Sequence, residues 1–178
     1  MYTQALKETL AGLMRRYKER VGDVQLIINQ MLAQGLIEKE DDIVNDHIAF
    51  RTMGVKHLGI NSLAQIFETY GYTRRDYYEF KTKKLNAFWF SPPTTIPNLP
   101  RIFISECKVH EFSQQTQDII TKYTASVTED PVAKLDLANG QEVDLFLHSS
   151  LWKTPTWEDY STVLSESEYA AWVLYNKY

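Results

Sequence analysis

The order of elements expected between residues 43 and 110 constrains this chain more than any other feature. Hydrophobic periodicity and turn residues predict a strand at 43–52 and strands at 77–80, 85–91 and 101–109. Between the first two strands they predict a helix that Asn61 or Ser62 caps and that stops at Gly71. The order is therefore strand, helix, strand, strand, strand. It predicts an α+β domain, although many α+β domains share this order.

Further elements are expected on both sides of this β-α-β-β-β unit. Before it, apolar residues recur at helical spacing over 4–20 and 24–34. After it, we expect helices over 112–123 and 165–178, and a short strand in the apolar run 143–147. The unit is therefore expected to lie between N-terminal helices and a C-terminal helix.

The length of 178 residues favours one domain over 1–178. Within it we expect a helical N-terminal segment at 1–40, the β-α-β-β-β unit at 43–110, and a mixed, largely helical segment at 111–178. A net charge of −4 makes the chain a poor candidate for a nucleic-acid or anionic-membrane binder. No apolar run approaches the roughly 20 residues that span a bilayer. The N-terminus also lacks the plan of a signal peptide, so a cytoplasmic location is expected.

The cysteine and histidine counts limit the metal sites that the chain could form. A single cysteine, Cys107, excludes an internal disulfide and a cysteine metal cluster, and we expect it to be a buried thiol. Metal ligands would have to be histidines or carboxylates. The chain has four histidines, and two of them, His57 and His110, are expected to be ordinary surface residues. His148 precedes two serines, but adjacent residues of an extended chain point apart, which argues against hydrolase chemistry there.

His47 and Arg51 form the most informative pair in the sequence. Because alternate residues of a strand share a face, His47, Ala49 and Arg51 should point the same way. In the functional interpretation, His47 binds a metal and Arg51 binds a substrate carboxylate through two parallel hydrogen bonds. In the structural interpretation, His47 is a core histidine and Arg51 forms an internal ion pair. Periodicity alone leaves both open.

Other polar residues of the unit could contribute to the same site. Glu106, on the last expected strand, either faces the pocket as a metal ligand or forms an ion pair with Lys108. A second set of candidates consists of Tyr78, Lys83, Lys84 and Arg101. These side chains either bring positive charge and a hydroxyl close to a bound diacid substrate, or form a solvated edge of the sheet.

Four segments, in order along the chain, resemble one enzyme family. They are Asn45–Thr52 (NDHIAFRT), Lys83–Phe90 (KKLNAFWF), Pro100–Glu106 (PRIFISE) and Ser167–Trp172 (SEYAAW). Together they are similar to the 2-oxoadipate dioxygenase/decarboxylases, and the similarity runs from about residue 45 to the end. The resemblance implies a vicinal-oxygen-chelate-like fold, a two-unit architecture built from β-α-β-β-β units.

The resemblance also implies an activity and a site. Family members are expected to use Fe(II) and O2 to decarboxylate a 2-oxo diacid, giving 2-hydroxyglutarate and CO2 from 2-oxoadipate in lysine breakdown. The first histidine ligand of the family falls on His47, and its carboxylate-binding arginine falls on Arg51. A second histidine and a glutamate complete the facial triad, and both belong to a second unit that we do not find in this chain.

The missing ligands leave several alternatives open. The chain could be part of a longer protein, or a half that pairs as a homodimer so that His47 and Glu106 of each copy surround one metal. It could also be a module without catalysis, or a metal-dependent hydrolase or isomerase of the same architecture. In the first two cases its partners are a 2-oxo acid and O2.

Overall fold

The computed structural model describes residues 2–176, which form seven α-helices and one four-stranded sheet. The strands are β1 (His47–Met53), β2 (Thr73–Phe80), β3 (Leu85–Ser91) and β4 (Arg101–Cys107). The helices are α1 (Tyr2–Arg20), α2 (Gly22–Ala33), α3 (Ile60–Thr69), α4 (Gln114–Thr124), α5 (Gly140–His148), α6 (Trp157–Glu166) and α7 (Glu168–Asn176). The expected α+β class and the β-α-β-β-β order, β1-α3-β2-β3-β4, are confirmed.

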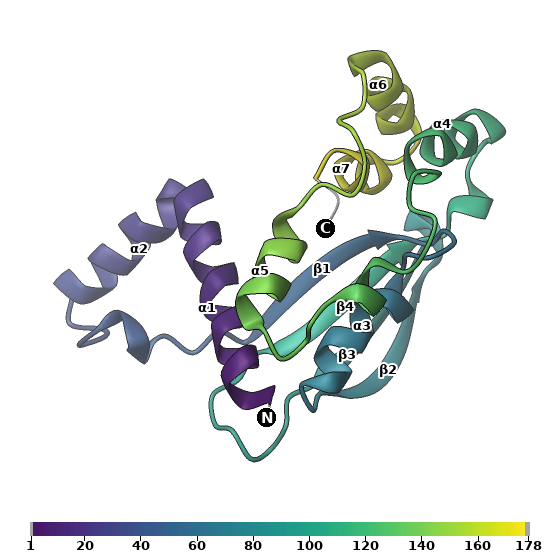
Figure 1. Cartoon of the computed structure of the whole chain (residues 1–178). Coiled ribbons are helices and arrows are strands. Elements are labelled where there is room, and N and C mark those ends of the chain that lie inside the picture. Colours follow the sequence, from purple (N-terminus) through teal and green to yellow (C-terminus); the bar gives the residue numbers. More distant parts are fainter. Residues whose placement is uncertain (1, 177–178) are drawn as a thin grey trace.

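The sheet has the strand order β1-β4-β3-β2, so the first strand of the unit pairs with the last (Figure 1). β1 and β4 are parallel, with His47 opposite Arg101 and Arg51 opposite Ser105. The other two pairings are antiparallel, as short connections between consecutive strands allow. This order leaves β1 and β2 at the two edges of the sheet.

One face of the sheet packs against α3 and against the pair formed by α1 and α5. Phe50 of β1 and Ile102 and Ile104 of β4 lie on this face, where they meet the fully buried Leu63 and Phe67 of α3. Burial of such a side chain contributes about 1.5–3 kcal/mol. This face is therefore the main core of the protein.

A second apolar cluster joins α4, α6 and α7 to the carboxyl ends of β1 and β4. It includes Met53 and Cys107 from the strands and Val163 and Val173 from α6 and α7. The expectation that Cys107 is buried is confirmed, and burial raises the pKa of its thiol to about 12. Helices α4, α6 and α7 thus cover only one end of its second face (Figure 1).

The strand expected at 143–147 is wrong, because these residues lie in α5. The side chain of Asn139 caps this helix by accepting a hydrogen bond from the backbone N–H of Glu142 at 3.2 Å. Val143, Phe146 and Leu147 are buried at helical spacing, toward the main core. A short apolar run does not by itself distinguish a strand from a buried helix.

The C-terminal helix expected at 165–178 is also different in the structure. α6 ends at Glu166 and α7 begins at Glu168, so Ser167 separates two helices. Residues 177–178 of the expected helix lie outside the described residues. None of the helices among residues 2–176 combines the length and the apolar character that crossing a bilayer requires.

Candidate functional site

The second face of the sheet carries the polar residues that the sequence singles out. His47, Ala49 and Arg51 are exposed on it, whereas Phe50 and Thr52 of the same strand are buried on the opposite face. The predicted shared face of His47 and Arg51 is therefore confirmed. Because α7 and its neighbours cover only one end of this face, we call its uncovered part the open face.

His47 is held by its neighbour Asp46 at the start of β1. The Nδ1 atom of His47 lies 3.0 Å from Oδ2 of Asp46, whose Oδ1 accepts a hydrogen bond from Nη1 of Arg101 at 3.0 Å. The hydrogen bond with His47 and the charge of Arg101 lower the pKa of the Asp46 carboxyl. This contact orients the ring and leaves Nε2 of His47 without a hydrogen-bond partner among residues 2–176.

Arg51 lies over two aromatic rings of α7. Its guanidinium carbon is 4.7 Å from the ring centre of Trp172 and 5.7 Å from that of Tyr169. Within the described part of the chain, Arg51 forms no hydrogen bond and no ion pair, so the internal ion pair of the structural interpretation is absent there. Cation–π contacts position a guanidinium without using its N–H donors. Arg51 therefore keeps its donors available for a ligand.

Tyr169 fixes α7 to the sheet and so positions the rings beneath Arg51. Its hydroxyl donates to the carbonyl oxygen of Ser105 at 2.8 Å and accepts from the backbone N–H of Thr52 at 3.2 Å. Burial raises the pKa of this hydroxyl, which stays protonated. The sequence placed Tyr169 and Trp172 on a helix but did not connect them with Arg51. Their i, i+3 spacing was the available signal, since it puts both rings on one helical face.

Two adjoining hollows lie on the open face, and Phe103 lines both of them. One, of about 500 Å³, is lined by His47, Arg101 and Tyr78, and the other, of about 490 Å³, by Arg51 and two lysines. The second set of sequence candidates therefore borders these hollows: Tyr78, Lys83, Lys84 and Arg101. Carboxylates also line the hollows, and those of Asp46 and Glu166 pair with Arg101 and Lys84. Arg51 and Lys83 remain as cations without an ion pair among residues 2–176, and with the aromatic surface they suit a small organic acid.

Glu106 lies on the opposite face of the sheet from His47 and Arg51. Its Oε2 atom accepts a hydrogen bond from the backbone N–H of Ile60 at 2.8 Å, at the start of α3. This contact replaces the expected cap by Asn61 or Ser62. The expected ion pair with Lys108 is also wrong, because the ammonium of Lys108 contacts carboxylates of Glu79 and Glu111, each at 2.7 Å.

The position of Glu106 bears on the expected iron centre. The sheet separates Glu106 from His47, so the two do not meet at one ion within a single copy. Among residues 2–176, no three His, Cys, Asp or Glu side chains converge as a metal site would require. The described residues therefore do not fit a complete iron centre, and His47 is the single expected ligand that faces the hollows.

Comparison with known proteins adds to this geometry. A family model described as 2-oxoadipate dioxygenase/decarboxylase matches residues 9–178. The chain is 43% identical over 155 residues to the chloroplastic 2-oxoadipate dioxygenase/decarboxylase of Arabidopsis thaliana, a match covering 80% of this chain and 40% of that protein. The chain thus spans well under half the length of this relative.

Solved structures agree with this relationship. The structure of hydroxyglutarate synthase from Oryza sativa in complex with 2-oxoadipate matches at a TM-score of 0.83 and 36% identity, covering 99% of this chain and 56% of that one. A protein of Ralstonia eutropha described as belonging to the glyoxalase superfamily matches at a TM-score of 0.60 and 20% identity, which shows the fold alone. With nearly its whole length matched by the family model, this chain belongs to the 2-oxoadipate dioxygenase/decarboxylase family.

Proposed function

We propose that the open face binds a 2-oxo diacid such as 2-oxoadipate and contributes to its conversion, with O2, into 2-hydroxyglutarate and CO2. The observation that carries the proposal is Arg51, an exposed guanidinium beside a hollow that forms no ion pair with any residue of 2–176. An arginine binds a carboxylate through a planar pair of N–H donors. The family relationship supports 2-oxoadipate as the acid.

The neighbours of Arg51 suit the same ligand. Lys83 and Lys84 border its hollow, although Lys84 also donates to Oε1 of Glu166 at 3.1 Å. Phe103 supplies an apolar wall between the two hollows. In this arrangement Arg51 holds one carboxylate of the acid, and the aromatic side chains of the open face exclude water from its carbon chain.

The same proposal gives His47 the role of one ligand to Fe(II), with Asp46 orienting its ring. Bound iron would supply the oxidation chemistry, which no side chain of this site can perform. The remaining ligands would come from outside residues 2–176, since no complete ligand set lies within them.

The proposal is tested by binding of 2-oxoadipate to the 178-residue chain, measured by calorimetry. Arg51→Ala should weaken binding about 10- to 100-fold, because a hydrogen-bonded charge contact contributes about 1.5–3 kcal/mol. Arg75→Ala is the matched control, since it removes an exposed arginine of the same sheet that lines neither of the two hollows. Equal affinities for Arg51→Ala and the unchanged chain would overturn the role of Arg51.

A further inference from the structure

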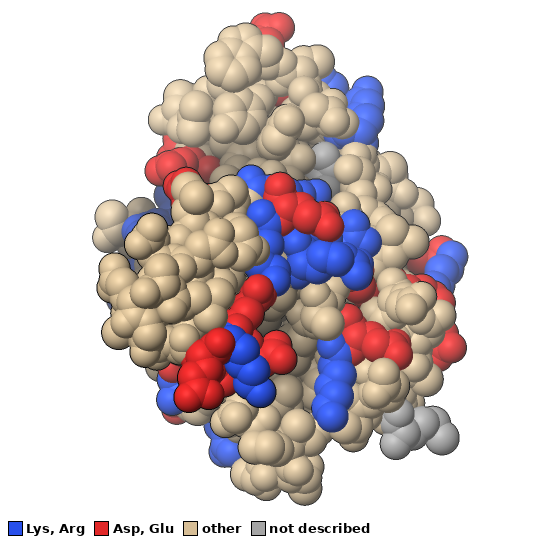
Figure 2. All heavy atoms as spheres, turned by 90° about the vertical axis from the view of Figure 1, so that its left-hand side faces the viewer, with Lys and Arg blue, Asp and Glu red and all other residues tan. Residues whose placement is uncertain are grey.

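A third cavity, of about 730 Å³, lies beside the edge strand β1, between α1, the end of α5 and α7. Its basic side chains are Arg16, Arg20, His47 and His148, and no Asp or Glu belongs to the lining among the described residues. Apolar side chains, including Leu13 and Trp172, form the rest of its wall. Figure 2, seen from the side of α1 and α2, shows Lys and Arg gathered at the middle of that face, with carboxylates beside them.

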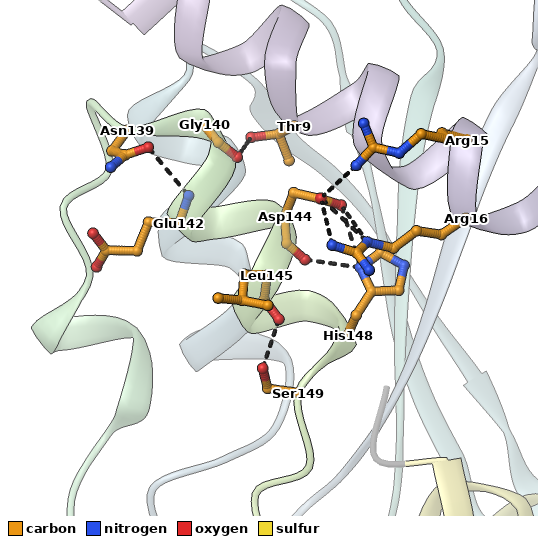
Figure 3. Close-up of polar contacts among 10 residues, drawn as sticks. All are labelled: Thr9, Arg15, Arg16, Asn139, Gly140, Glu142, Asp144, Leu145, His148 and Ser149. Atoms are coloured by element: carbon orange, nitrogen blue, oxygen red, sulfur yellow. Dashed lines mark hydrogen bonds and ion pairs between the residues drawn. The ribbon is translucent and has the colours of Figure 1, made fainter.

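A buried carboxylate behind the wall fixes part of this lining (Figure 3). Asp144 of α5 is only 4% exposed. It accepts from Nε and Nη2 of Arg16, at 3.2 and 3.1 Å to Oδ2, and lies 3.5 Å from Nη2 of Arg15. Nδ1 of His148 donates to the backbone carbonyl of Asp144 at 2.8 Å. Gly12 makes room for this carboxylate, because a Cβ atom there would collide with it.

The network leaves positive charge facing the cavity. One carboxylate is shared by Arg15 and Arg16, so the group keeps a net positive charge. Nη1 of Arg16 has no hydrogen-bond partner among residues 2–176, and Arg20 forms no ion pair with any of them. A guanidinium held rigidly by a buried carboxylate loses little side-chain entropy when it binds an anion. A contact that only joined α1 to α5 would not require the acid-free lining of the cavity.

We propose that this cavity is a second carboxylate-binding site, in which Arg16 and Arg20 bind the carboxylate of an organic acid and the apolar wall contacts its carbon chain. Asp144 is the positioning residue of this site, because it orients Arg16. Arg51 does not line this cavity, although His47 borders both the cavity and the hollow beside Arg101. The apolar part of the lining, including Leu13 and Trp172, favours an acid with one carboxylate and an apolar carbon chain.

The test is an NMR titration of the 178-residue chain with hexanoate, which carries one carboxylate and an apolar chain. We expect chemical-shift changes at residues that line this cavity and neither of the two hollows, such as Leu13 and Leu147. Arg20→Gln should weaken hexanoate binding about tenfold, because it removes a guanidinium that lines the cavity. Lys7→Gln is the charge-matched control, since it removes one positive charge from the same helix outside the lining, and should change the affinity less than about twofold.

A second pair of variants tests Arg16 without leaving a buried carboxylate unpaired. Asp144→Asn keeps the charge of Arg16, whereas Arg16→Gln combined with Asp144→Asn removes it. The double variant should bind hexanoate about tenfold more weakly than the single variant. Thermal unfolding of both proteins checks that each is folded.

Three results would overturn the proposal. In the first, Arg20→Gln binds hexanoate within twofold of the unchanged chain, and the double variant binds it within twofold of Asp144→Asn. In the second, Lys7→Gln weakens hexanoate binding as much as Arg20→Gln does. In the third, Arg51→Ala weakens hexanoate binding and Arg20→Gln does not, which would place the carboxylate of hexanoate on the open face. Loss of 2-oxoadipate binding in Arg51→Ala, with hexanoate binding unchanged, would support both sites independently.

Discussion

The two faces of the sheet are built from alternate residues of the same strands, yet they differ in almost every physical property. On β1, Phe50 is buried against α3, while its neighbours Ala49 and Arg51 are exposed. The buried face is apolar and is held by α3, whereas the open face carries cations and rings with cavities in front of them. Stability and binding are therefore expected to depend on different residues of one strand.

The largest expected effect tests the buried face. Phe67 is fully buried in α3, with its ring centre 5.3 Å from that of Phe50 and 5.8 Å from that of Tyr72. Phe67→Ala should lower the free energy of unfolding by about 3–5 kcal/mol, because it removes apolar contacts and leaves a cavity. Urea denaturation measures this, with Tyr77→Ala of the exposed edge strand as control. A loss below about 1 kcal/mol would break the comparison.

An intermediate effect is expected at Glu106, which lies on the α3 side despite its charge. Glu106→Ala removes the acceptor for the Ile60 N–H at the start of α3 and should cost about 1–2 kcal/mol. Glu106→Gln retains an acceptor and should cost less. Neither change should alter the affinity for 2-oxoadipate measured by calorimetry. A tenfold loss of affinity in Glu106→Gln would contradict the assignment of Glu106 to the other face.

The smallest effect concerns Glu166, which borders the hollow at Arg51. Burial alone would raise the pKa of this carboxyl, but hydrogen bonds from Ser113, Thr116 and Lys84 lower it from 4.5 to about 2. A lowered folded-state pKa stabilises the protein above pH 4.5, and this contribution disappears as the pH falls toward 2. Glu166→Gln should therefore be less stable than the unchanged chain at pH 6, and this difference should shrink as the pH falls from 4.5 toward 2, as measured by urea denaturation.

The control for this pH dependence is Glu38→Gln, which removes an exposed carboxylate from the connection between α2 and β1. The free energy of unfolding of Glu38→Gln should match that of the unchanged chain both at pH 6 and at the acidic end of the pH range. If Glu166→Gln shows the same dependence as Glu38→Gln, the contacts of Glu166 do not contribute to acid sensitivity.

The sequence predicted local features well and long-range contacts poorly. The alternation at 47, 49 and 51 was sufficient to assign both faces of β1, because side chains of a strand alternate regardless of what covers them. The cap by Glu106 and the rings beneath Arg51 were not predicted, since each joins segments that are distant in the sequence. The same holds for Asp144, whose cationic partners on α1 depend on how α5 packs against α1.

The parallel pairing of β1 with β4 also has a consequence for protein synthesis. β1 cannot join the sheet until β4 has emerged from the ribosome, whereas β2 and β3 can pair as soon as both are made. Until then Ile48 and Phe50 lack their strand partners Ile102 and Ile104. Because non-local pairing is slow, we expect the nascent chain to expose its first strand to chaperones during that interval.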